Sequence, residues 1–144
     1  MVSSFFSDWG QFSQLFRWEP FHIFVVGGGF ALGVVLLELV LERRIPERYL
    51  DDGGINKRVF QNRSLLHLTF LCLVIAIFEE LLFRAVLQTA FGLLAASLIF
   101  AVVHFRYLRQ PVLFSLVLLI SLSLGLLFEW TGSIYVTIFA HFFN

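Results

Sequence analysis

Long apolar stretches dominate this chain and decide what it can fold into. They run over Phe21 to Leu41, Leu65 to about Thr89, Phe91 to Phe105 and Val112 to about Trp130, and a fifth begins at Ser133. A helix that crosses a bilayer needs about 20 mostly apolar residues. Hydrophobic residues make up 59% of the chain and charged residues only 14%, a composition too apolar for a soluble fold of this size. We therefore predict an all-α polytopic bundle of about five transmembrane helices, covered by the lipid bilayer.

Two segments in the first half of the chain are not continuously apolar. Residues 1–20 mix aromatic side chains with Ser, Gln and Asp, so we predict an interfacial segment at the level of the lipid headgroups. Residues 42–63 form a polar loop with six Lys or Arg residues. We expect residues 1–63 to hold the interfacial segment, the first membrane helix and this basic loop. Residues 64–144 would then form a helix bundle with the candidate catalytic residues.

Positive charge alternates between the links that join the apolar stretches. The 42–63 loop has six Lys or Arg residues and the 106–111 link has two, whereas the 90–92 and 131–133 links have none. The positive-inside rule then places both basic loops in the cytoplasm and the N-terminus outside. The net charge is zero, which gives no reason to expect a nucleic-acid partner. We expect a multi-pass integral protein of a bacterial plasma membrane.

The second apolar stretch contains three charged residues, Glu79, Glu80 and Arg84. Each ionised side chain at mid-bilayer costs at least about 2.5–3.5 kcal/mol, so such residues are functional candidates. Glu80 and Arg84 are four residues apart and can pair on one helix face. Glu79 lies about 100° around the helix and is left as the candidate general base. The competing interpretation is a buried ion cluster that only specifies packing.

The third apolar stretch contains His104, which shares a helix face with Phe100. Glu79 and His104 are 25 residues apart, and their midpoint falls on the proposed turn at Phe91-Gly92. Each residue is therefore about 12 residues, or roughly 19 Å, from that turn at the rise of an α-helix. The sequence thus predicts that Glu79 and His104 meet at the same depth across an antiparallel helix hairpin.

The last stretch adds His141, about nine residues or roughly 14 Å from the turn at Thr131-Gly132. Thr137, His141 and Asn144 form a polar stripe on this otherwise apolar helix. Two chemistries are open. Glu79 and His104 can activate a water while His141 and an amide stabilise the oxyanion. Alternatively, Glu79, His104 and His141 can hold a divalent metal such as zinc with a bound water, although the HExxH pattern is absent.

These residues resemble the motifs of the CPBP family of membrane proteins, which includes CAAX prenyl endopeptidases and bacteriocin-processing or immunity proteins. The pattern EExxxR stands at Glu79 to Arg84, and FxxxH stands at Phe100 to His104. Residues 125–134 are similar to the family's segment before its last motif. The resemblance covers about residues 65–144.

The resemblance implies an intramembrane endopeptidase in which Glu79 and His104 activate water. His141 and Asn144 would stabilise the oxyanion, with Glu80, Arg84 and Phe100 in support. Members are described both as metalloproteases and as metal-independent glutamate proteases, so the resemblance leaves the metal open. The family's last motif puts its Asn or Asp four residues after the histidine, whereas Asn144 follows His141 by three. We therefore expect the natural chain to continue beyond Asn144.

Three functions are compatible with these patterns. The first is hydrolysis of a peptide bond in a membrane-associated protein or peptide substrate. The second is a non-catalytic membrane chaperone, immunity or assembly factor that binds other membrane proteins. The third is an ion or proton carrier, which the lack of an internal repeat disfavours. The serines of the fourth stretch, Ser115, Ser121 and Ser123, are expected only to bond carbonyls one turn earlier in their own helix.

Overall fold

The structure is a computed structural model that describes residues 9–51 and 53–143, in which every regular element is a helix. The helices of the first half are α2 (Trp9–Gln14), the π-helix η1 (His22–Gly27), α3 (Gly28–Arg44), the 3₁₀ turn η2 (Glu47–Tyr49) and α4 (Ile55–Phe60). The second half contains α5 (Leu65–Glu80), the π-helix η3 (Leu81–Gln88), α6 (Thr89–Phe91), α7 (Leu93–Val103), η4 (Phe105–Tyr107), α8 (Pro111–Thr131) and α9 (Ile134–Phe142).

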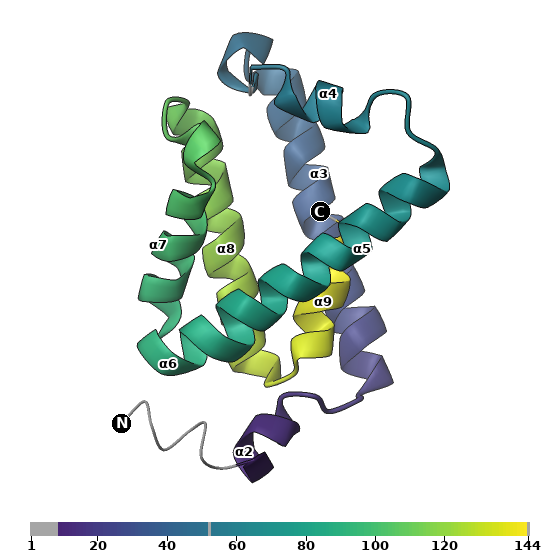
Figure 1. Cartoon of the computed structure of the whole chain (residues 1–144), viewed down its shortest axis with the longest axis vertical. Helices are drawn as coiled ribbons and strands as arrows, with labels where there is room; N and C mark the ends of the chain where they lie inside the picture. The colour runs from purple at the N-terminus through teal and green to yellow at the C-terminus, as the bar shows by residue number, and fades with distance from the viewer. Residues whose placement is uncertain (1–8, 52, 144) are drawn as a thin grey trace.

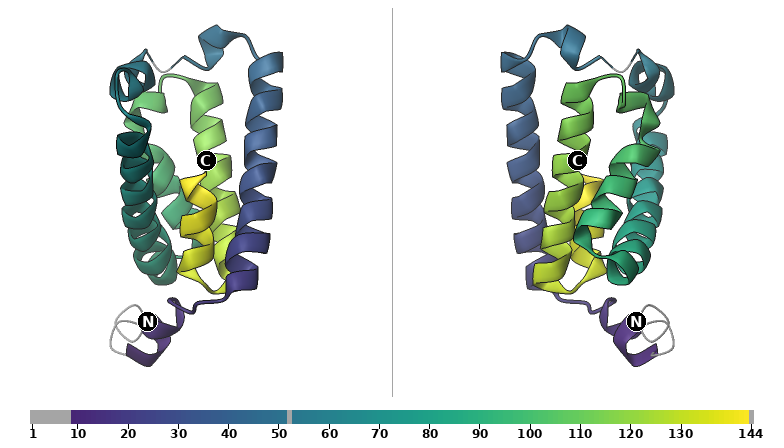
Figure 2. Two further views of the ribbon diagram at one scale, coloured as in Figure 1. Left: turned by 90° about the vertical axis from the view of Figure 1, so that its right-hand side faces the viewer. Right: turned by 90° about the vertical axis from the view of Figure 1, so that its left-hand side faces the viewer.

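Four helical segments surround the short helix α9 (Figures 1 and 2). The run α5–η3–α6 is continuous and lies on one side of α9, while η1–α3 lies on the other. The helices α7 and α8 complete the bundle beside them. Tight turns reverse the chain at Gly92, with φ 85°, and at Gly132, with φ 63°, a backbone conformation that favours glycine. The Gly132 N–H donates to the Phe128 carbonyl at 2.8 Å and so ends α8.

The predicted order of helices is confirmed, but the number of membrane crossings is not. Within residues 9–51 and 53–143, two helices are long and apolar enough to cross a membrane, His22–Arg44 and Pro111–Thr131. The helix α7 has 11 residues and α9 has 9, which correspond to rises of roughly 17 and 14 Å, against an apolar thickness of about 30 Å. The run α5–η3 contains the three charges discussed above. The count of five spans therefore stays a prediction.

The apolar core lies around α9. Ile134, Val136 and Ala140 have no exposed surface. Val136 and Ala140 pack with residues of η1 and α8, whereas Ile134 packs in a second cluster with Ala85 and Phe128. Most large side chains on the outer faces of α3 and α7 remain exposed, as expected for helices that contact lipid. The position of α9 is thus set by contacts on all of its sides.

Glycines in a membrane helix can let neighbouring helices approach closely, and two of the four glycines in the first apolar stretch do so here. A Cβ at Gly27 would lie 3.0 Å from the Val136 carbonyl oxygen, and a Cβ at Gly28 would lie 3.6 Å from the Phe139 ring. Gly29 and Gly33 face open space. The close approach is therefore between η1 and α9, at the start of the stretch.

Gly125 on α8 provides a test of the packing between α7, α8 and η3. An alanine Cβ there would clash with Leu93 Cδ1 and would lie 2.8 Å from Gln88 Oε1. We expect Gly125→Ala to destabilise the protein by about 1–3 kcal/mol, because the two side chains must move and Gln88 loses its bond to the Gly125 carbonyl. Gly33→Ala is the matched control and should not destabilise. Reversible denaturation in detergent measures both, and equal effects would contradict this packing.

Candidate active site

Glu79 and Glu80 end the regular helix α5, and the π-helix η3 begins at the next residue. A π-helix has a wider turn than an α-helix and is frequent at functional sites. The helices α7 and α9 pack against this part of the run and present His104 and His141 to it. The polar residues of three separate helices therefore converge at the point where the helix geometry changes.

Glu79 lies between the two histidines, as the sequence predicted. His104 Nε2 is 3.8 Å from Glu79 Oε1, and His141 Nε2 is 3.6 Å from Glu79 Oε2. The three side chains are 26%, 24% and 16% exposed for Glu79, His104 and His141. Both separations are too long for a direct hydrogen bond but suit a bridging water. The predicted equal depth of Glu79 and His104 is confirmed.

The second nitrogen of each imidazole has its own partner. His104 Nδ1 is 2.8 Å from the Phe100 carbonyl oxygen, and His141 Nδ1 is 2.9 Å from Glu80 Oε1. A carbonyl or carboxylate acceptor fixes the proton on Nδ1, so in the neutral tautomer Nε2 presents its lone pair. In both histidines it is this Nε2 atom that lies near Glu79.

A buried chain of polar groups supports His141 from behind. Glu80 accepts from Arg84 Nε at 3.1 Å through its second carboxylate oxygen, and neither side chain has exposed surface. The predicted pairing of Glu80 with Arg84 is confirmed. Both terminal nitrogens of Arg84 donate to Ser121 Oγ on α8, at 3.3 and 3.2 Å. The chain Ser121–Arg84–Glu80–His141 therefore joins three helices.

The role predicted for Ser121 was wrong, whereas the role predicted for Ser123 was correct. Ser123 Oγ donates to the Leu119 carbonyl one turn earlier at 2.8 Å. Ser121 instead faces Arg84, because α8 turns that side toward η3. The sequence contained a signal, a serine in an apolar helix, but not the rotation of α8 that decides its partner.

Aromatic rings hold His104 in place. The His104 ring stacks on Phe100, with centroids 4.5 Å apart, and lies parallel to the ring of Tyr107 at 6.2 Å. The Arg106 side chain lies over the Tyr107 ring at 4.5 Å and bonds its hydroxyl. Phe100 was predicted to support the site, and Tyr107 was not. Its distance from His104 in sequence, only three residues, was the available signal.

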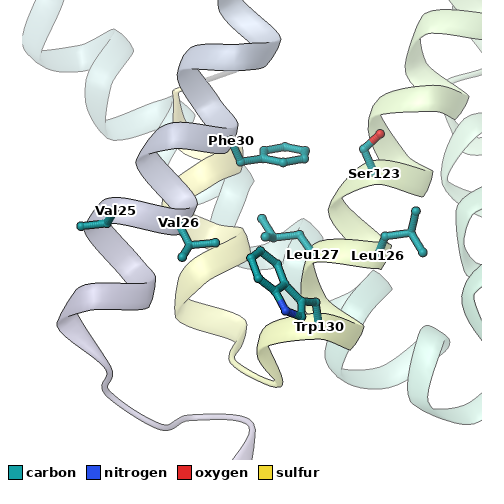
Figure 3. A pocket seen from close by; sticks show the side chains of 7 residues that line it. All are labelled: Val25, Val26, Phe30, Ser123, Leu126, Leu127 and Trp130. Carbon is teal, nitrogen blue, oxygen red and sulfur yellow. The ribbon is translucent and has the colours of Figure 1, made fainter.

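The site opens into a cavity of about 560 Å³ lined by α5, α7, α8 and α9. Glu79, His104 and His141 line it together with Cys72 and Tyr107. A larger groove of about 760 Å³ lies between η1–α3 and α8 (Figure 3). Its lining is apolar except for Ser123 and the indole nitrogen of Trp130, so it contains no group for acid–base chemistry. The smaller cavity is therefore the candidate active site.

A metal ion held by Glu79, His104 and His141 was the second chemistry that the sequence left open. Zinc holds its ligands at about 2.0–2.2 Å, so the donor atoms of a tetrahedral site lie about 3.3–3.6 Å apart, within a few tenths of an ångström of the 3.6 and 3.8 Å separations found here. Among residues 9–51 and 53–143, no group of three His, Cys, Asp or Glu side chains is arranged to hold a metal ion. Metal binding by Glu79, His104 and His141 therefore stays a prediction.

One further prediction concerns Asn144, and one buried polar residue, Gln88, was not predicted. Asn144, predicted to help stabilise the oxyanion, lies outside the described residues. Gln88, one turn beyond Arg84 and not predicted to matter, is buried and donates to the Gly125 carbonyl at 2.9 Å and to Glu129 at 3.3 Å. Polar groups therefore line the bundle interior beyond the cavity.

The structure is an all-helical bundle in which a carboxylate lies between two imidazoles, and it has helices apolar enough to span a membrane. These features define the class: a helical membrane protein with a buried Glu/His centre. Residues 61–144 match the model of the Rce1-like family, described as type II CAAX prenyl endopeptidase Rce1-like. The chain is also 46% identical over 138 residues to the uncharacterized protein YpbD of Bacillus subtilis (strain 168), covering 96% of this chain and 73% of YpbD. No solved structure matches the chain.

The chain therefore belongs to the Rce1-like family, a membrane-embedded family of the CAAX protease type. This confirms the family resemblance found in the motifs. The match includes Glu79, His104 and His141 but begins after the first 60 residues, which contain α2, η1 and α3.

The buried ion pair can be tested by a double-mutant cycle. Arg84→Leu leaves the Glu80 carboxylate buried without its cation, so we expect a loss of about 3–5 kcal/mol in the free energy of unfolding. The double variant Glu80→Leu/Arg84→Leu should recover much of that loss, because no unpaired charge remains. Denaturation in detergent gives all three values. Additive losses would show that the two side chains are not coupled.

Proposed function

We propose that this protein is an intramembrane endopeptidase that hydrolyses a peptide bond with a water activated by Glu79 and His104. The observation that carries the proposal is the Glu79 carboxylate, which lies 3.8 and 3.6 Å from the Nε2 atoms of His104 and His141 inside a cavity. Membership of the Rce1-like family supports the same activity. The reaction class is acyl transfer to water.

Glu79 and His104 would orient the attacking water. With Nδ1 of His104 donating to the Phe100 carbonyl, Nε2 can accept one water proton while Glu79 accepts the other. The oxygen lone pair of the water is then left to attack the substrate carbonyl. General-base assistance of this kind contributes typically 10²–10⁴-fold to the rate.

His141 would stabilise the oxyanion as an imidazolium. Its Nδ1 donates to Glu80, so when the ring carries both protons its Nε2 donates into the cavity. Arg84 balances the charge of Glu80 and holds it in position. Glu80 and Arg84 are thus positioning residues, whereas Glu79, His104 and His141 would touch the reacting atoms.

Glu79 can both take up and return the proton that the hydrolysis transfers. The water oxygen bonds to the carbonyl carbon, and Glu79 takes the proton that the water loses. When the tetrahedral intermediate collapses, the C–N bond breaks and Glu79 gives that proton to the leaving amine. The products are one carboxylic acid and one amine, and the ionised Glu79 is regenerated.

The substrate would be a protein or peptide held at the membrane. The family description names CAAX prenyl endopeptidases, so a peptide with a lipid-modified C-terminal region is one candidate class. With the basic 42–63 and 106–111 links in the cytoplasm, the cavity beside Arg106 opens toward the cytoplasmic half of the bilayer. This placement assumes the five-span topology of a multi-pass bacterial plasma-membrane protein.

The decisive variant is Glu79→Gln, which keeps the shape of the side chain and removes the base. We expect specific cleavage products to fall at least 10²-fold in membranes of cells that carry this variant, with protein abundance unchanged. The measurement is a quantitative comparison of peptide termini with wild-type membranes. Glu129→Gln is the matched control, because Glu129 is exposed on α8 and does not line the cavity. Identical peptide profiles with a preserved cellular role would favour the non-catalytic assembly function.

Chelation distinguishes the two forms of water activation. Because the side chains alone supply the base and the oxyanion donor, we expect purified protein in nanodiscs to keep its cleavage activity after extraction with a strong zinc chelator. Loss of activity that returns only on adding zinc would contradict direct activation by Glu79. The variant Glu79→Gln, treated in parallel, gives the background rate.

A further inference from the structure

The helix that carries His141 is short and depends on a segment far away in sequence. The helix α9 has nine residues, and isolated helices under about 12–15 residues are marginal in water even for favourable sequences. Its position therefore comes from its neighbours. Several of these neighbours belong to residues 15–27, which precede the part of the chain that matches the family.

The N-terminal segment caps the start of α9. The Ile134 N–H, which has no partner within its own helix, donates to the Leu15 carbonyl at 2.8 Å. Ser133 Oγ donates to the Arg17 carbonyl at 3.0 Å, and Ser133 has no exposed surface. Two backbone carbonyls, more than a hundred residues earlier in the chain, thus fix the N-terminus of α9.

Side chains extend this contact along the helix. The Tyr135 ring packs edge-on against Trp18, with centroids 5.6 Å apart, and against Phe16 at 6.1 Å. Leu15 and Phe16 also pack against the buried cluster that contains Ile134. Figure 2 shows α2 beneath the end of the bundle where α9 begins. Residues 15–18, part of the segment predicted to lie at the membrane interface, therefore also pack against the bundle.

Gly27 of η1 also contacts α9, at Val136, which is closer to the site than the start of the helix. A Cβ at this position would lie 3.0 Å from the Val136 carbonyl oxygen and 3.4 Å from Val136 Cγ1. Val136 is five residues before His141, or about 7.5 Å along the helix. Because a helix moves as a rigid body, a displacement at Val136 is passed to His141. The 2.9 Å bond from His141 to Glu80 has little tolerance for such a displacement.

We infer that residues 15–27 form a positioning element of the active site, which holds α9 at the depth where His141 meets Glu79 and Glu80. Leu15 and Arg17 fix the start of α9, and Gly27 sets its distance from η1. The effect on catalysis rests on the proposed peptidase function, whereas the effect on the position of α9 does not. The site is then assembled from both halves of the chain.

Gly27→Val and Gly29→Val form a matched pair for testing this inference. Both replace a helical glycine by the same residue two positions apart, but a Cβ at Gly29 meets nothing within 4 Å. We expect Gly27→Val in the full-length protein to lower kcat by about 10²-fold with a much smaller change in KM, since misplacing a catalytic group by about 1 Å can cost that much. Gly29→Val should leave both constants unchanged.

A second readout does not depend on cleavage. Cys72, the one cysteine in the sequence, lines the same cavity as His141 and Phe142. Its labelling rate with a small uncharged maleimide should therefore change in Gly27→Val and stay the same in Gly29→Val. If no protein in the series cleaves peptides, the peptidase proposal fails, and the labelling rates still test the position of α9.

Ser133→Ala is the milder variant if Gly27→Val does not accumulate. It removes the hydrogen bond from Ser133 to the Arg17 carbonyl. It should therefore change kcat and the labelling rate of Cys72 in the same direction as Gly27→Val, but by a smaller factor. Ser123→Ala is its control, because Ser123 donates to the Leu119 carbonyl within its own helix α8. Equal effects of Gly27→Val and Gly29→Val, or no change in kcat and labelling in Gly27→Val or Ser133→Ala, would overturn the inference.

Discussion

The fully buried pair of Glu80 and Arg84 is the interaction on which the rest of the structure depends. A lone carboxylate in this interior would be unstable, so Glu80 needs Arg84, and both terminal nitrogens of Arg84 in turn donate to Ser121. The other carboxylate oxygen of Glu80, Oε1, then accepts from His141 Nδ1. One ion pair thus fixes the relative positions of η3, α8 and α9. It also leaves Glu79, the adjacent residue, outside this ion pair and facing the cavity.

The different roles of the neighbouring residues Glu79 and Glu80 follow from helix geometry. Glu80 points into the bundle and is fully buried, whereas Glu79 is about a quarter exposed and lines the cavity. The two carboxylates therefore differ in environment although they are adjacent in sequence. A fixed, neutralised carboxylate suits support of an imidazole, and a partly hydrated one suits exchange of a proton with water. The π-helix that begins at Leu81 places this change of environment beside both histidines.

Local regularities made part of this structure predictable. The rise of an α-helix is fixed, so the turn at Gly92 determined that Glu79 and His104 would lie at one depth, and the four-residue spacing determined the pair of Glu80 and Arg84. Contacts that depend on rotation about a helix axis were not predictable. Helices in lipid are apolar on most faces and lack the polar stripe that shows which side faces inward. The partners of Ser121 and the docking of Leu15 onto α9 therefore came only from the structure, and the number of membrane crossings stays a prediction.

The central claim, that Glu79 acts on water as a base, can be tested most directly with ¹⁸O-labelled water. A single turnover of a substrate identified from its cleavage products, carried out in labelled water, would be followed by mass spectrometry of the product and of the peptide that contains Glu79. General-base action predicts one ¹⁸O atom in the new carboxyl group of the product and none in Glu79. Label in the Glu79 side chain would contradict it, because it would mean that this carboxylate attacks the substrate itself and is then released by water.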